Sequence, residues 1–197
     1  MKKVYVFVPL FLCLIVASSV MTTCLKMSED ISDKVFRLHI LANSDEKYDQ
    51  SLKLAVRDEI LKISEVVYNN CKSVDEAIES TNSNIELFEK TALNVIKSYG
   101  FNYDVSVYTA KEFFNTRQYD DFTLPAGIYD SLKIEIGEAK GHNWWCVMFP
   151  SVCLSGCVSD FEESLSEEEI KMIESDKYVI RFKTVEIVER IKNRALE

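Results

Sequence analysis

The chain has 197 residues, of which 47% are hydrophobic, and a formal net charge of −9 at pH 7. This length is enough for one ordinary domain with its own core once an N-terminal targeting segment is set aside. The acidic balance argues against two classes of partner, because phosphate backbones and anionic lipid headgroups would repel such a surface. We therefore expect no nucleic acid as a partner.

The first 23 residues are typical of a secretory signal. Lys2 and Lys3 precede an uncharged run, residues 4–21, and this order matches the basic start and apolar core of such signals. The run is also close to the about 20 apolar residues that span a bilayer, so an uncleaved signal-anchor stays open. In either case the chain is exported, and we expect it to meet a membrane only through this segment.

Small residues near the end of the apolar run favour cleavage. Ala17 and Ser19 have the A-x-A type of spacing found at cleavage sites, which favours a signal peptide over an anchor. Residues 24–34 then form a polar lead-in. Residues 35–197 show no linker and no repeat, which predicts a single folded domain.

The folded part begins with a strand and two long helices. Residues 35–41 alternate between apolar and polar side chains, as a half-buried strand does. Asn43 with Glu46 forms a capping box that opens the first helix, and Ser73 with Glu76 opens the second in the same way. The apolar residues at helical spacing in the first helix are Leu52, Val56, Ile60, Ile63 and Val67, and those of the second extend from Val74 to Tyr99.

The second half of the domain predicts strands and a helical ending. Residues 101–107 and 128–136 alternate like strands, whereas residues 144–149 are continuously apolar and predict a strand buried on both faces. Ser166 with Glu169 opens a short helix. The remaining predicted elements are a strand over residues 178–182 and a helix over residues 185–191.

This order of elements is typical of an α+β domain, in which helices and strands are segregated along the chain. The two long helices follow each other directly, so they can pack side by side. We expect an antiparallel sheet with two long helices packed on one face, plus a C-terminal helical segment.

The usual catalytic signatures are missing from the sequence. It contains only two histidines, His39 and His142, and neither stands in a metal-binding H-E-x-x-H helix. A phosphate loop, a G-x-S-x-G elbow and a G-x-G-x-x-G turn are also absent. His39 beside Arg37 could act as a general base, but a core or solvent-facing histidine is the better explanation. We expect no catalytic residue, no metal and no cofactor.

Three cysteines near one histidine leave two alternatives open. Cys146, Cys153 and Cys157 follow His142, and such a group can form a zinc site or a thiol nucleophile with a histidine base. If Pro150 turns the chain back, Cys146 and Cys153 can instead form a disulfide across a hairpin. We favour the disulfide, because zinc would need a second pair of ligands. A secreted thiol-dependent hydrolase remains the alternative function.

Two segments are candidates for recognition. Asn43, Ser44 and Asp45 lie where a strand ends and a helix begins, so backbone N–H groups there could bind an anion, although a helix cap is the simpler explanation. Trp144 and Trp145 are candidates because tryptophan is enriched in binding hot spots. Adjacent residues of a strand face opposite ways, so one of them can be core while the other is exposed.

The regions around these two segments, together with residues 124–129, resemble a known family. Residues 36–45 read FRLHILANSD, residues 124–129 read LPAGIY, and residues 143–150 read NWWCVMFP and are followed by Cys153. In this order, these motifs resemble the signatures of the stage II sporulation protein R family. The resemblance extends over about residues 35–153 and so covers most of the exported part of the chain.

The resemblance implies a sporulation signalling protein without catalysis of its own. Members of the family are secreted from the forespore into the intermembrane space between forespore and mother cell. There they activate a membrane-embedded aspartic protease, the sigma-E factor processing peptidase, from its extracytoplasmic side. The protease then cleaves pro-sigma-E in the mother cell, so the expected partner of this chain is that protease.

The family signatures concentrate in two segments, and we expect the contact surface there. The candidate partner-binding residues are Asn43, Ser44, Asp45, Trp144, Trp145 and Phe149. The alternative is that these residues form turns and core that define the fold. The sequence alone leaves both explanations open.

Overall fold

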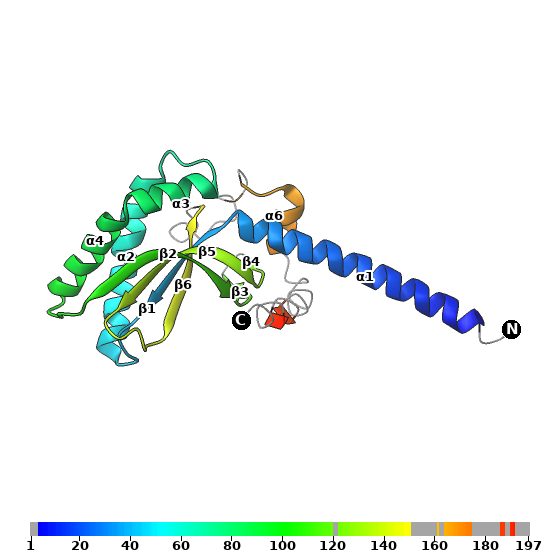
Figure 1. Ribbon diagram of the computed structural model, residues 1–197, viewed down its shortest axis with the longest axis horizontal. Coiled ribbons are helices and arrows are strands. Elements are labelled where there is room, and N and C mark those ends of the chain that lie inside the picture. Colours follow the sequence, from blue (N-terminus) through cyan, green and yellow to red (C-terminus); the bar gives the residue numbers. More distant parts are fainter. Residues whose placement is uncertain are drawn as a thin grey trace.

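A mixed four-stranded sheet forms the centre of the molecule, and helices lie on both of its faces (Figure 1). The described residues of this computed structural model are 4–119, 122–150, 161, 164–174, 186–187 and 190–191. The strands are β1 (Phe36–Leu41), β2 (Val105–Phe114), β5 (Gly127–Ile136) and β6 (Asn143–Phe149), in the spatial order β2-β5-β1-β6. The chain is therefore an α+β protein, as its sequence predicts.

The prediction of an antiparallel sheet is wrong at one of the pairings. β1 runs antiparallel to β6 but parallel to β5, with Leu38 opposite Leu132. β2 and β5 pair antiparallel. β5 thus lies between β2 and β1, antiparallel to the first and parallel to the second. Side chains alternate in the same way in parallel and antiparallel strands, so the sequence pattern does not distinguish the two directions.

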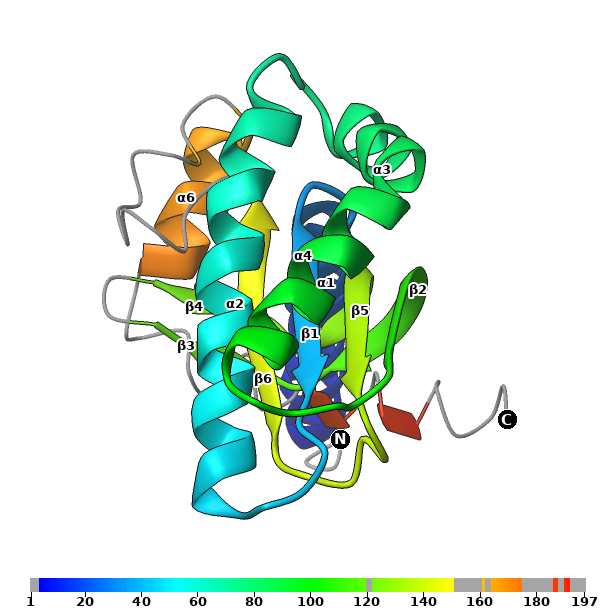
Figure 2. The ribbon, with the colours of Figure 1, turned by 90° about the vertical axis from the view of Figure 1, so that its left-hand side faces the viewer.

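One face of the sheet is covered by α2 (Lys47–Tyr68), α3 (Val74–Ser83) and α4 (Ile85–Ser98). Figure 2 shows α2 and α4 in front of the sheet, with α3 beyond one end of α4. Apolar side chains from the helices and from alternate strand positions form the first core between them. Its members include Phe36, Leu38, Ile40, Leu52, Val56, Ile60, Phe88, Ala92, Ile96, Leu132 and Ile134. The predicted apolar stripes therefore face the sheet.

The second predicted helix is not a single long helix, so the description of two long helices needs correction. It is divided into α3 and α4 at Asn84, whose φ of −118° and ψ of 17° are not helical. The Asn84 side chain donates from Nδ2 to the Ser80 carbonyl at 2.8 Å, a local bond that competes with helix continuation. A stripe of apolar residues continues across the break, and for this reason the pattern predicted one helix.

The two capping predictions for these helices have different outcomes. Ser73 caps α3 as predicted, since its side chain accepts from the Glu76 N–H at 3.3 Å. The prediction for Asn43 is wrong, because α2 begins at Lys47 with Glu46 as its N-cap residue. The Asn43 side chain is instead bonded to two other parts of the chain, as described below.

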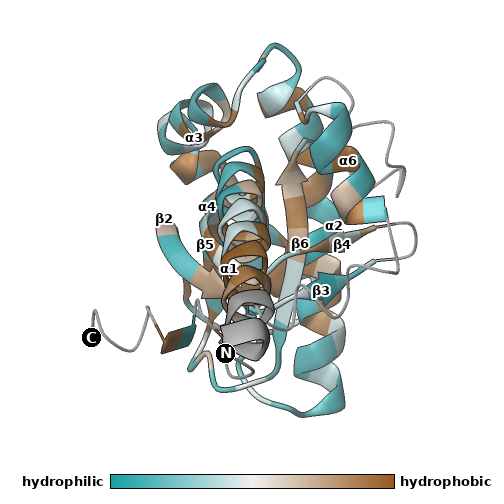
Figure 3. Ribbon diagram, turned by 90° about the vertical axis from the view of Figure 1, so that its right-hand side faces the viewer, coloured by the Kyte–Doolittle hydropathy of each residue, from teal (hydrophilic) through white to brown (hydrophobic). Residues whose placement is uncertain are grey.

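The second face of the sheet is covered by the last turns of α1 (Val4–Asp33), by a small ribbon of β3 (Arg117–Gln118) and β4 (Thr123–Leu124), and by α6 (Glu167–Glu174). Figure 3 shows α1 projecting from this face. The second core contains Ile31, Val35, Phe114, Phe122, Leu124, Tyr129, Val147, Phe161, Leu165, Met172 and Ile173. The predicted start of α6 is confirmed, since the Ser166 N–H and hydroxyl both bind the Glu169 carboxylate.

Helix α1 is uninterrupted and joins the apolar N-terminal segment to the folded part. Its apolar residues between Phe11 and Val20 are exposed, and Phe11 itself is 66% exposed. From Phe11 onwards the helix is long and apolar enough to cross a membrane, a property that signal sequences share. Its last turns are buried: Ile31 is inaccessible, and the Ser28 hydroxyl donates to the Ala126 carbonyl at 3.3 Å. The predicted lead-in over residues 24–34 is therefore mostly helical and packs against the sheet.

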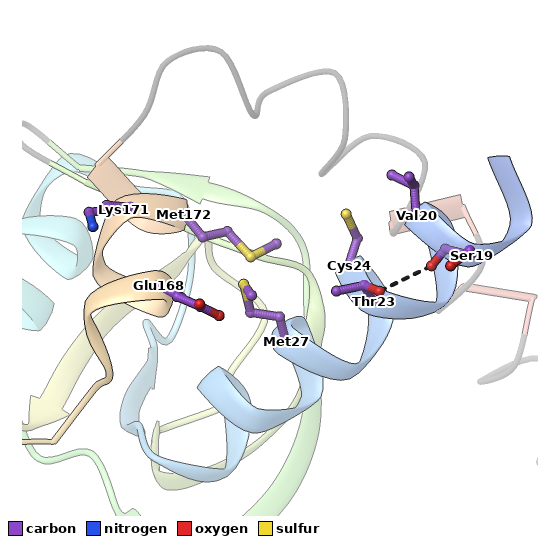
Figure 4. Close-up of a pocket in the computed structure, with 8 residues that line it drawn as sticks. All are labelled: Ser19, Val20, Thr23, Cys24, Met27, Glu168, Lys171 and Met172. Carbon is purple, nitrogen blue, oxygen red and sulfur yellow. Dashed lines mark hydrogen bonds between the residues drawn. The ribbon is translucent and has the colours of Figure 1, made fainter. Parts of the chain in front are cut away.

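A groove of about 420 Å³ lies between α1 and α6 (Figure 4). It is lined by Ser19, Val20, Thr23, Cys24, Met27, Glu168, Lys171 and Met172. Ser19 belongs to the predicted cleavage site, and Met172 belongs to the second core. The predicted cleavage site therefore lies where α1 leaves the folded part.

Several sequence predictions fall on residues outside the described ranges. They are the strand over residues 178–182, most of the helix over residues 185–191, and the roles of Cys153 and Cys157. These stay predictions.

Candidate functional site: a platform of two turns

Two turns meet at one end of the sheet. Residues 42–46 follow β1, and residues 137–142 connect β5 to β6. The backbone N–H of Gly141 donates to the Ala42 carbonyl at 2.9 Å, and that of Lys140 donates to the Asn43 carbonyl at 3.2 Å. We refer to residues 42–46 and 137–142 together as the platform, which lies at the lower end of the sheet in Figure 2.

The Asn43 side chain joins the two turns to helix α2. Its Oδ1 accepts from the Glu138 N–H at 3.0 Å, and its Nδ2 donates to Asp49 Oδ2 at 2.9 Å. The Ser44 hydroxyl donates to the same Asp49 oxygen at 2.6 Å. Burial alone would raise the pKa of Asp49, but these hydrogen bonds outweigh it and lower the pKa. Asp49, only 5% exposed, is therefore a buried carboxylate that holds the first turn.

Lys53 holds the second turn from the same helix. It is only 3% exposed, and its Nζ donates to the His142 carbonyl at 2.8 Å and to Gln50 Oε1 at 2.7 Å. Gln50 in turn donates from Nε2 to the Ser44 carbonyl at 2.9 Å. Burial lowers the pKa of Lys53. One turn of α2 thus supplies three polar side chains that fix the platform.

Two positions in the platform have no room for a side chain. Gly137 has a φ of +59°, and a Cβ there would collide with the Asn43 side chain. A Cβ on Gly141 would collide with the Ser44 backbone. The close approach of the two turns therefore requires glycine at both positions.

The platform and the adjoining first turn of α2 together expose three side chains of different chemistry. Asp45 accepts from the His142 N–H at 2.6 Å and also pairs with the His142 ring, whose side chain is 80% exposed. These bonds lower the pKa of the Asp45 carboxyl. Tyr48, in the first turn of α2, is 78% exposed. An acid, an imidazole and a phenol are thus held on a rigid support.

The predicted tryptophans lie beside the platform, on opposite faces of β6. Trp144 packs against the first core, and the Arg57 guanidinium lies 4.5 Å from its ring centre. Trp145 packs at the edge of the second core, with ring centres 5.8 Å from His39 and 6.0 Å from Phe114. Both side chains are partly buried. Each is therefore both a packing residue and a surface residue.

Phe149 lies at the other end of β6 from the platform. It is buried in the first core, where its ring centre is 6.2 Å from that of Tyr68. The structure therefore brings Asn43, Ser44, Asp45 and Trp144 to one end of the sheet, and it leaves Phe149 in the interior.

The second face of the sheet contains a polar cluster that the sequence did not reveal. His39 Nδ1 lies 2.7 Å from Glu112 Oε2, and Lys133 Nζ lies 2.9 Å from Glu112 Oε1. Burial would raise the pKa of Glu112, but the hydrogen bonds and charges of these two partners lower it to about 2. Burial also opposes the charge on Lys133, yet Glu112 raises the pKa of the amine. The alternation of charged residues along β1, β2 and β5 was the available signal.

The sequence model of stage II sporulation protein R matches residues 32–159. The chain belongs to this family. A relative described as stage II sporulation protein R, from Bacillus subtilis (strain 168), is 33% identical over 167 residues, which cover 84% of this chain and 70% of the relative. No solved structure matches the chain. The family match makes this a sporulation protein, and the platform lies within the matched residues.

The structure also limits the roles that Cys146 can have. Cys146 is disulfide-bonded, so its sulfur is not a free thiol nucleophile. Its predicted partner, Cys153, lies outside the described residues, and the pairing stays a prediction. His142 precedes Cys146 by four positions, which along a strand corresponds to about 13 Å. Among the described residues, no group of three or more His, Cys, Asp or Glu side chains could hold a metal ion.

Proposed function

We propose that this chain is an exported signal that activates the membrane-embedded sigma-E factor processing peptidase, an aspartic protease, by binding its extracytoplasmic side. In this proposal, the chain is secreted from the forespore into the intermembrane space, and pro-sigma-E is cleaved in the mother cell. Family membership and the apolar N-terminal helix support the role in sporulation and the export. The contact surface and its partner are the parts that need a test.

The observation that carries the proposal is the way in which the platform is held. Burying an amine or a carboxylate costs several kcal/mol unless hydrogen bonds compensate. Here Asp49 and Lys53 are buried, and their bonds fix two surface turns rather than two core elements. Rigid turns lose little conformational entropy when they bind, which favours affinity. A polar support of this kind is what a preformed contact surface needs.

The proposed roles of the candidate residues follow from where they lie. Asn43 and Ser44 point into the platform and position it. Asp45, Tyr48 and His142 point outward and make the contact. Binding activates the protease only if the active conformation binds the platform more tightly than the inactive one does, because a ligand shifts an equilibrium by its differential affinity.

Trp144 and Trp145 extend this surface along β6, whereas Phe149 is buried at the far end of the strand and is assigned to the core. The alternative function, a thiol-dependent hydrolase, gains no support from the described residues. Of its candidate nucleophiles Cys146, Cys153 and Cys157, only Cys146 is among the described residues, and it is disulfide-bonded; the nearest histidine in sequence, His142, is paired with Asp45.

The test is reconstitution in a non-sporulating host that produces this chain, the protease and pro-sigma-E, with the shortened sigma factor measured by immunoblot. We expect cleavage that depends on export of the chain. Tyr48→Ala combined with His142→Ala should reduce cleavage at least about tenfold, as the loss of a binding hot spot does. Tyr99→Ala, which removes an exposed tyrosine ring at the end of α4, outside the platform, should leave it unchanged.

The outcomes separate the function from the contact surface. Export levels and the melting temperature of each variant are measured alongside, so that a folding defect is recognised. If the Tyr48/His142 double variant supports as much cleavage of pro-sigma-E as the wild type does, the platform is not the contact surface. Absence of cleavage with all three wild-type proteins present would show that the chain does not activate this protease.

A further inference from the structure

The outer edge of β2 is long and regular. All ten residues of Val105–Phe114 pair with β5 in one continuous register, without a bulge and without a proline. Within the described part of the chain, β2 pairs with no strand on its other side. Ser106, Tyr108 and Lys111 are exposed in the middle of this edge.

The direction of the backbone groups on β2 follows from one hydrogen bond. The Gly137 N–H donates to the Asp104 carbonyl at 2.9 Å, so residue 104 points its carbonyl towards β5. In an antiparallel pair, successive residues alternate between bonding the neighbour and pointing away from it. The N–H and C=O groups of Val107, Thr109 and Lys111 therefore point outward, away from β5.

Such an edge is a template for another strand. Natural sheets protect their edges with prolines, bulges or outward-pointing lysines. The lysine on this edge does not serve that purpose, because Lys111 Nζ is held by Asp130 of the neighbouring strand at 2.7 Å. We therefore expect a partner strand whose backbone N–H and C=O groups pair with those of this edge.

We propose that the partner is a second copy of this chain, with the two β2 strands antiparallel about a twofold axis at Thr109. In this register the outward groups of residues 105–113 all find partners, and Thr109 faces its own copy. Val107 lies opposite Lys111, and Ser106 lies opposite Glu112, so no like charges meet. A shift of the axis to Lys111 would place two lysines against each other, which is unfavourable.

The helices leave room for this pairing. α3 contacts both β2 and β1, so it packs over one end of the sheet and not outside the edge of β2. The side chain of Thr109 also belongs to this region, since its Oγ1 donates to Asn82 Oδ1 at 2.9 Å. Two copies can therefore form one continuous sheet with their α2, α3 and α4 layers on the same side.

This dimer goes beyond the proposed function and does not depend on it. The platform lies at the end of the sheet next to the start of β2. An antiparallel pairing therefore places the two platforms at opposite ends of one extended sheet. A ligand with two contact surfaces can engage two receptor chains and gain affinity through effective concentration.

The test compares two substitutions at the centre of the edge. Thr109→Pro removes an outward N–H that pairs with no strand among the described residues of the chain, and edge strands tolerate proline at such positions. Thr109→Val keeps that N–H, and both substitutions remove the bond to Asn82. The full chain is exported with its own N-terminal segment, and the recovered protein is measured by sedimentation equilibrium over a wide concentration range.

We expect the wild type and Thr109→Val to be dimers and Thr109→Pro to be a monomer with an unchanged circular dichroism spectrum. Thr109→Cys provides a second measurement, and it leaves the dimer intact. The Cα atoms of hydrogen-bonded antiparallel pairs lie about 5.5 Å apart, which is within disulfide range. Thr109→Cys should cross-link two copies, whereas Ala110→Cys should not. A wild type that is monomeric throughout, or a Thr109→Cys chain that does not cross-link, would overturn the proposal and leave the edge to a strand of a different protein.

Discussion

On strand β1, Phe36 and Leu38 point to the face under α2 and α4, whereas Arg37 and His39 point to the face under α1. The first face buries apolar side chains, and the second buries charged groups among aromatic rings. The Arg37 guanidinium is inaccessible and lies 4.2 Å from the Phe114 ring centre. Neighbouring positions on one strand thus serve two kinds of core, one that depends on packing and one that depends on compensated charge.

The largest effect is expected on the apolar face. Phe36→Ala removes a fully buried ring that packs against Tyr68, with ring centres 6.5 Å apart. Large-to-small changes of this kind cost about 3–5 kcal/mol of the free energy of unfolding. Urea denaturation of the purified chain measures it. A loss below about 1 kcal/mol would mean that the first core can collapse around the gap.

A smaller and pH-dependent effect is expected at Glu112. Glu112→Gln removes the carboxylate that pairs with both His39 and Lys133, although Lys133 keeps Glu135 at 3.3 Å, and should cost about 1–3 kcal/mol at pH 7. The pKa of Glu112 is about 2 in the folded chain, against an ordinary value of 4.5. The carboxylate therefore stabilises the fold above pH 4.5, and this contribution is lost as the pH falls towards 2.

The measurement is the difference in unfolding free energy between the wild type and Glu112→Gln across that pH range. The difference should shrink steadily below pH 4.5, because the unfolded wild type then binds a proton at Glu112 while the folded wild type keeps this carboxylate charged down to a pH of about 2. Titration of the other carboxylates affects both chains alike and cancels. A difference that stays constant down to pH 2 would show that the His39 and Lys133 contacts do not hold the carboxylate charged.

The smallest effect is expected at Arg37, in spite of its complete burial. Its Nη2 donates to the Tyr119 hydroxyl at 2.8 Å, but Nε and Nη1 have no hydrogen-bond partner among the described residues. Arg37→Met removes this incompletely hydrogen-bonded charge and keeps most of the volume, so it should change the free energy of unfolding by at most about 1 kcal/mol. Arg37→Ala is the control, since it also opens a cavity. Equal, large losses in both variants would assign Arg37 a stabilising charge interaction.

The sequence predicted the elements of the fold better than their arrangement. Alternation located β1 and β5, and the apolar run located β6, because these patterns depend on burial alone. The break at Asn84 was missed because the apolar stripe continues through it. The parallel pairing of β1 with β5 was missed because the path of the chain between the two strands decides it, and the sequences of the strands themselves do not show their direction.

The candidate site was located by its segment but not by its chemistry. The pattern around Asn43 was interpreted as a helix cap, because a capping residue and a turn residue use the same polar side chains. The sequence pattern did not single out Asp49 or Lys53, and only the fold shows that they are buried beneath the platform. Tyr48 was missed for the opposite reason, since an aromatic residue in an amphipathic helix is expected to face the core.

Helix α1 has a mechanical consequence. It has no break between its apolar turns and the turns that pack on the sheet, and Ile31 and Ser28 fix its end in the second core. As long as the apolar turns remain attached and lie in a bilayer, α1 and the sheet move as one rigid body. A tilt of the helix then swings the platform through space, and cleavage near Ser19 would remove this constraint and let the domain rotate freely.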